Sequence, residues 1–125
     1  MNRIRMIALV ALASGFAASA ALAQSQSALN ATAAQNLQRA DRALNAQYTA
    51  TAGQLSTPSR TLLRDAQRAW ITFRDQQCRY ESSAVRGGSA FAMVQSDCLA
   101  RLTVERTADL RRMAQCEEGD LSCPR

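Results

Sequence analysis

The chain has 125 residues, with 15 basic and 10 acidic side chains and a net charge of +5; every basic residue is arginine, and histidine is absent. Without imidazole there is no ordinary Ser-His or Cys-His nucleophile pair and no histidine metal ligand, so we expect neither an enzyme, nor a metal site, nor a cofactor. The modest positive charge also lacks the clustered basic stripe of a nucleic-acid-binding protein.

Residues 1–23 are predicted to be a secretory signal peptide. Arg3 and Arg5 give a positive start, an apolar run follows over 6–13, and the Ala-Leu-Ala of 21–23 offers small residues to signal peptidase. The apolar run is short and rich in alanine and serine, which disfavours a retained membrane anchor. Cleavage would leave 13 basic and 10 acidic residues, a net charge of +3, in a periplasmic or secreted chain without an integral membrane anchor.

A flexible leader is expected over 24–36, where "QSQSALNATAAQN" is polar, small and weakly patterned and turns helical only toward its end. The domain itself is predicted over 37–125. Its first helix begins at Leu37 and carries an apolar stripe at three-, four- and seven-residue steps. "GQLSTPS" ends this helix, and Thr57-Pro58 is a typical restart, with threonine at the N-cap and proline at the first helical position.

The second helix is expected over 58–84. One face of it carries the predicted inner side chains: Leu62 or Leu63, Ala66, Trp70, Phe73, Gln77, Tyr80 and Ala84. Asp75 and Arg79, four positions apart, are expected to pair on the helix surface.

The segment "RGGS" over 86–89 is the next break, and Ser89 is the expected cap of a third helix over 90–113. The inner side of that helix is predicted to carry Phe91, Val94, Cys98, Leu102, Leu110 and Met113. The tail "CEEGDLSCPR" reads as a compact loop.

No window alternates as a strand would, so the fold class is all-α: a small antiparallel three-helix bundle, or helical hairpin, stapled by disulfides. A two-helix hairpin with a loosely attached first helix is the alternative.

Four cysteines in an exported chain favour disulfides. Cys98 and Cys116 lie mostly within one predicted helix, roughly 25 Å apart, and a Cys78–Cys116 bridge would meet a mismatch on the order of 25 Å across the hairpin. Cys78 and Cys98 are about equally far from the glycine turn, so the predicted pairs are Cys78–Cys98 and Cys116–Cys123. Metal binding is the rival reading, but no C-x-x-C pair is present.

Three segments together resemble a known family: "LRDAQRAWITFRDQQC", "GGS" and "CLARLTVERTADL" are similar to the lysozyme inhibitor LprI-like domain, over about 44–113. This is a small exported helical domain of bacteria, most of whose members have no established function. The resemblance assigns motif roles to Gln67, Gly87, Gly88, Ser89, Thr103 and Arg106. Many relatives carry further cysteines before the first helix, and this chain has none there.

Gln67, Trp70, Arg74 and Cys78 line one helical face. Because Cys78 is expected to bond Cys98, Trp70 reads as core and Arg74 as a seam residue that pairs with Glu105, Asp109 or a backbone carbonyl. The functional alternative is an exposed Trp70–Arg74 contact site for a protein partner. Arg106 is expected to join an ion pair.

The resemblance implies inhibition of lysozyme, a protein-binding activity in the envelope, directed at an envelope protein or a host lysozyme. Secreted lysozymes are typically basic, so the positive net charge would slow their encounter with this chain. A local acidic patch at Glu117, Glu118 and Asp120 is the candidate docking surface. The alternative function is a periplasmic structural or stress-related helical protein with no dedicated enzyme target, and the sequence does not specify an oligomeric state.

Overall fold

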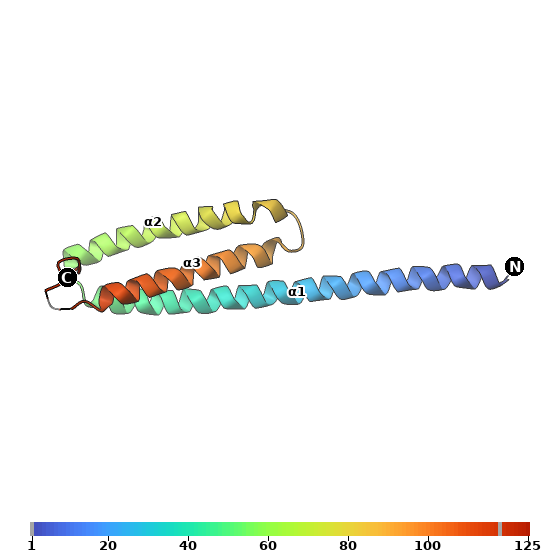
Figure 1. Ribbon diagram of the computed structural model, residues 1–125, viewed down its shortest axis with the longest axis horizontal. Coiled ribbons are helices and arrows are strands. Elements are labelled where there is room, and N and C mark those ends of the chain that lie inside the picture. The colour runs from blue at the N-terminus through green and yellow to red at the C-terminus, as the bar shows by residue number, and fades with distance from the viewer. Residues whose placement is uncertain (1, 118) are drawn as a thin grey trace.

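The computed structural model describes residues 2–117 and 119–125, with side chains described at Ala21 and from Ser25 onward except at position 118. Its helices are α1 (Asn2–Gly53), α2 (Thr57–Glu81) and α3 (Phe91–Ala114), with a short 3-10 turn, η1 (Ser83–Val85), after α2. No strand occurs in the described part of the chain, so the predicted all-α three-helix fold is confirmed (Figure 1).

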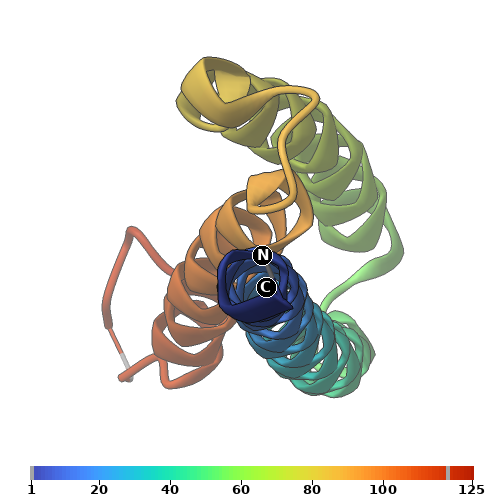
Figure 2. The same ribbon diagram turned by 90° about the vertical axis from the view of Figure 1, so that its right-hand side faces the viewer.

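α3 is the central helix of the bundle. It packs along the C-terminal half of α1, whereas α2 runs beside α3 at a wider spacing and contacts α1 far less (Figures 1 and 2). The buried side chains of the α1–α3 seam are small or of medium size: Ala33, Ala40, Leu44, Thr51, Thr103, Thr107 and Leu110. The N-terminal part of α1 projects beyond the hairpin of α2 and α3 (Figure 1).

Residues 24–36 belong to α1 and are helical throughout, in place of the predicted flexible leader that becomes helical only toward its end. Ala33 is 2% exposed, and the Asn30 side-chain amide donates to the Ser89 carbonyl at 3.0 Å. The segment is rich in alanine, the best helix former, so a weak apolar pattern is enough for it to continue the helix.

The helix caps differ in detail from the expected ones. Ser56, not Thr57, is the N-cap of α2; its hydroxyl accepts from the Ser59 N–H, and Pro58 follows in the first turn. Ser89 does not cap α3, because Ala90 occupies that position without a side-chain bond. Gly87 has φ +79, a backbone conformation that explains a glycine in the turn before α3.

α2 is rotated relative to the predicted orientation. The expected inner residues Leu62, Phe73 and Tyr80 are 71%, 55% and 75% exposed. The buried positions are Gln67 and Cys78. The Cys78 bond to α3 fixes the rotation of α2, because the residues on the Cys78 side must then face the bundle. On α3, the expected inner residue Met113 is likewise exposed.

Both predicted disulfides are confirmed. Cys78–Cys98 joins α2 to α3 with 5.5 Å between the Cα atoms. Cys116–Cys123 closes the tail with 5.7 Å between the Cα atoms. All four cysteines are thereby bonded.

Candidate partner-binding groove

Arg74 connects all three helices. Its Nη1 donates to Asp41 Oδ1 of α1 at 3.2 Å and to Thr103 Oγ1 of α3 at 3.1 Å, and its Nη2 lies 3.0 Å from Asp75 Oδ1. The expectation of a seam residue therefore holds, but the expected partners do not. Two other arginines pair with those acids: Arg101 with Glu105, and Arg112 with Asp109.

Trp70 is half-buried beside two guanidinium groups. Arg74 lies over the indole with 5.3 Å from its guanidinium carbon to the ring centroid, and Arg106 lies 5.9 Å away. Such contacts stabilise a cation over the negative face of the ring. Trp70 thus has a structural role within the bundle and still exposes part of its ring.

Arg106 forms no ion pair within the described chain, contrary to expectation. Its Nε donates to Gln67 Oε1 at 3.0 Å, so the amide oxygen of this buried residue has a partner. Thr103 and Arg106, the two residues of the T-x-x-R motif, therefore both contact the stripe of α2 that carries Gln67 and Trp70. The Asp75–Arg79 pair is also absent from the ion pairs of the described residues, because Asp75 pairs with the adjacent Arg74.

An apolar hollow of about 300 Å³ lies where α1 ends, α2 begins and α3 ends. Its walls are mainly apolar, with Arg106 as the charged member; the lining residues are Thr51, Leu55, Ser59, Leu62, Leu63, Ala66, Arg106, Met113 and Pro124. Because Arg106 also contacts Trp70, the hollow lies next to the predicted contact residue.

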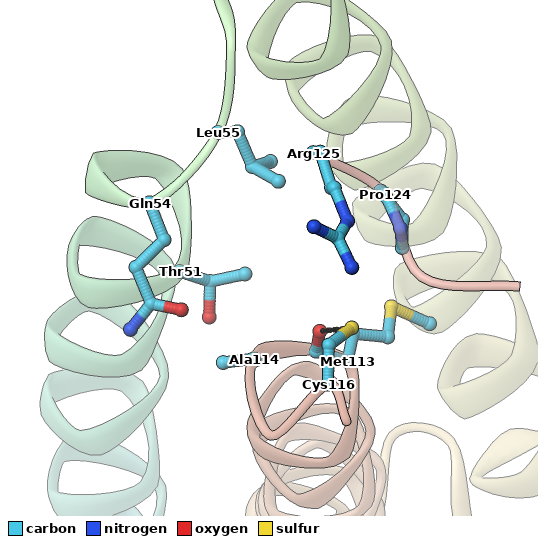
Figure 3. A pocket seen from close by; sticks show the side chains of 8 residues that line it. All are labelled: Thr51, Gln54, Leu55, Met113, Ala114, Cys116, Pro124 and Arg125. Carbon is cyan, nitrogen blue, oxygen red and sulfur yellow. Dashed lines mark hydrogen bonds between the residues drawn. The ribbon is translucent and has the colours of Figure 1, made fainter. Parts of the chain in front are cut away.

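A second hollow of about 510 Å³ adjoins the first and shares Thr51, Leu55, Met113 and Pro124 with it. Figure 3 shows the Arg125 guanidinium reaching in from the tail, between Leu55 and Pro124. The two hollows together are called the end groove below. It combines an apolar lining with an arginine from α3 and another from the tail.

The tail borders the end groove. Two hydrogen bonds fix Arg125 in place: its carbonyl oxygen accepts one from the Ser56 hydroxyl at 2.6 Å and one from the Ser59 hydroxyl. Cys116 and Pro124, which bracket the acidic residues, line the groove.

The acidic residues of the tail are only partly described. Glu117 and Asp120 are exposed, and Glu118 lies outside the described residues. Hydrogen bonds from the Ser122 hydroxyl and N–H lower the pKa of Asp120, so this carboxylate is a fixed negative charge at neutral pH.

The described residues contain no cluster of three acidic or cysteine side chains that could hold a metal ion. None of the described helices is long and apolar enough to cross a membrane. No sequence pattern assigned Asp41, Leu55 or Arg125 to this region. Asp41 carried no signal beyond its place on α1, because only the fold brings it within reach of Arg74.

These features define a small disulfide-linked helical domain whose exposed chemistry suits binding. The model of the family described as lysozyme inhibitor LprI matches residues 17–110, and the chain belongs to this family. It is an inhibitor family and not an enzyme family.

Two further proteins are similar to the chain. An uncharacterised protein of Rhizobium meliloti (strain 1021) is 37% identical over 110 residues, covering 78% of this chain and 79% of its own. The crystal structure of a DUF1311 family protein from Pseudomonas putida KT2440 matches with a TM-score of 0.66 and 26% identity, over 71% of this chain and 93% of that one.

Proposed function

We propose that the chain is an exported protein-binding module of the cell envelope that inhibits lysozyme. The observation that carries the proposal is its membership of the LprI family over residues 17–110. The two disulfides support an oxidising compartment outside the cytoplasm. Export through a signal peptide cleaved after position 23 belongs to the same proposal, and N-terminal sequencing of the processed protein, expected to start at Gln24, tests it.

The end groove and the adjoining Trp70 are the proposed contact surface. Tryptophan and arginine are the side chains most often found at the energetic centre of protein interfaces. Lysozyme cleaves its substrate with two carboxylates in an open cleft. The guanidinium groups of Arg106 and Arg125 present forked donors that match a carboxylate.

The acidic tail has a second role in this proposal. The net charge of the processed chain would repel a basic lysozyme at long range. Exposed carboxylates at Glu117 and Asp120 provide a local surface of the opposite sign, and Glu118 adds to the charge of the same segment. This segment would orient the partner beside the groove.

The test is a lysozyme activity assay combined with direct binding, using oxidised protein purified after export. We expect stoichiometric binding and inhibition, both weakened at least about tenfold by Trp70→Ala. Replacing the three acidic tail residues with their amides should slow association with a basic lysozyme. The control is Val104→Ala, an exposed apolar position on α3.

Unaffected lysozyme, from protein shown to be folded, would contradict the proposal. It would favour the alternative of a structural or stress-related envelope protein. One observation supports that alternative: Trp70 already contacts Arg106 of α3, and Arg74 already contacts α1 and α3 of the same chain.

A further inference from the structure

One side of α2 carries an apolar stripe that stays exposed along its length, and at its N-terminal end this stripe also lines the end groove. Leu62, Ala66, Ala69, Phe73 and Tyr80 follow one another at steps of four, three, four and seven positions, so they share one side of the helix. All five are exposed. Gln76 is the remaining member of this side, so the stripe carries no charge over about 27 Å. These five apolar residues are called the α2 stripe.

A contiguous apolar face of this length is typical of an interaction surface. It is also the face that the apolar pattern of the sequence would place in a core. The disulfide to Cys98 and the hydrogen bonds of Gln67 and Arg74 turn a different face inward. The α2 stripe is therefore available to a partner without any change in the bundle.

We propose that the α2 stripe binds the same stripe of a second copy of this chain, with the two α2 helices antiparallel about a two-fold axis at position 71. In this register Leu62 faces Tyr80 of the second copy, and Ala69 faces its Phe73. Each contact occurs twice by symmetry. A small side chain opposite a large one lets two helices approach closely and interdigitate.

Charge favours the same register. Asp65 and Arg79 lie on one flank of the α2 stripe, and the antiparallel pairing brings Asp65 within two positions of Arg79 of the second copy, about 3 Å along the axis. Asp65 is exposed and pairs through Oδ1 with the adjacent Arg64. Its Oδ2 and the whole guanidinium of Arg79 have no hydrogen-bond or ion-pair partner in the described chain. Two such pairs would fix the direction of the helices.

Sedimentation velocity on the oxidised, exported protein tests the proposal over a concentration series. We expect a dimer that dissociates on dilution, and Phe73→Glu should raise its dissociation constant at least about tenfold. Tyr80→Ser is the second stripe variant, with the same expected direction. Val104→Glu is the matched control, because Val104 is an exposed apolar residue of α3 outside the stripe. Circular dichroism establishes that each variant is folded.

A charge-reversal pair tests the register. Asp65→Arg alone should weaken the dimer by placing arginine opposite arginine, and Asp65→Arg with Arg79→Asp should restore it. A monomeric wild type at about 100 μM, a dimer insensitive to Phe73→Glu and Tyr80→Ser, or failure of the double reversal would each overturn the proposal. So would a monomer that uses Phe73 to bind a different protein. The two proposed surfaces share Leu62 and Ala66. No lysozyme enters this experiment, and the variants lie outside the end groove, so its failure is distinguishable from failure of the proposed function.

Discussion

Arg74 of α2 lies 3.2 Å from Asp41 of α1, and this ion pair joins the two helices of the bundle that contact each other least. The Arg74 side chain is 15% exposed. The same Nη1 donates to Thr103 of α3. α2 is thus held to the rest of the fold by one disulfide and a small number of polar contacts, and less by a continuous apolar seam.

Replacing Arg74 should therefore destabilise the domain more than a surface arginine does. We expect Arg74→Ala to lower the free energy of unfolding by about 1–3 kcal/mol, because it removes the hydrogen bond to Thr103 and the packing on Trp70. Arg74→Lys should restore little, since an ammonium group lacks the planar fork. Urea denaturation measures both. Arg68→Ala, on the exposed part of α2, is the control, and equal losses at the two positions would contradict the argument.

The two disulfides should contribute very differently. Cys78–Cys98 closes a separation of 20 residues between two helices, and the chain-entropy model gives about 3 kcal/mol for such a loop. We expect the variant with alanine at both Cys78 and Cys98 to lose most of this free energy of unfolding, and its α2 to separate from α3.

Cys116–Cys123 spans only 7 residues of tail. Its removal should leave the thermal midpoint of the helices nearly unchanged, because the bonded segment lies after α3. Thermal unfolding of the two double variants separates these cases. A large loss from the tail variant would show that the tail supports the bundle through the contact of Arg125 with Ser56 and Ser59.

The sequence pattern predicted the three helices, both breaks and both disulfides, because periodicity and cysteine spacing are local or one-dimensional properties. It did not predict the rotation of α2. Two stripes on that helix could face the bundle: an apolar one that contains Phe73, and one that contains Trp70 and Cys78. Apolar periodicity favours the first, whereas a covalent bond and buried hydrogen bonds favour the second.

The candidate site was foreseeable only in part for a similar reason. Trp70 and Arg74 were identified from their spacing. Asp41 and Arg125 come from distant parts of the chain, and no local pattern indicates that either one reaches this region. The helix over 24–36 is favoured by its alanine content and by the burial of Ala33, a residue too small to strengthen an apolar pattern.

A pair of neighbouring alanines tests whether 24–36 is part of the folded domain. Ala33 is buried against the bundle, and Ala34 is exposed. Ala33→Arg should cost roughly 2 kcal/mol or more, because a long charged side chain must displace the packed seam. Ala34→Arg should change stability by no more than about 0.5 kcal/mol. Chemical denaturation of both variants decides the matter, and equal effects would mean that this part of α1 does not pack in solution.

The loss of folding stability at acidic pH should depend on Glu81. The pKa of Glu81 is lowered, first because Gln77 donates a hydrogen bond to the carboxylate and then because Arg101 does the same. A folded-state pKa below the ordinary value of 4.5 means that the unfolded chain takes up the proton more readily. The stabilisation is therefore complete above that value and is lost as the pH falls through the folded-state pKa.

We expect Glu81→Gln to unfold at lower urea concentration than the wild type above about pH 5.5, and the difference to shrink as the pH falls below the ordinary value of 4.5. Arg101→Gln should reduce the same pH-dependent difference, because it removes the charged partner of Glu81. Urea midpoints at a series of pH values measure the effect. If the difference in urea midpoint between wild type and Glu81→Gln stays constant over this pH range, it would contradict the lowered pKa. The lower stability of the variant would then come from the lost hydrogen bonds alone.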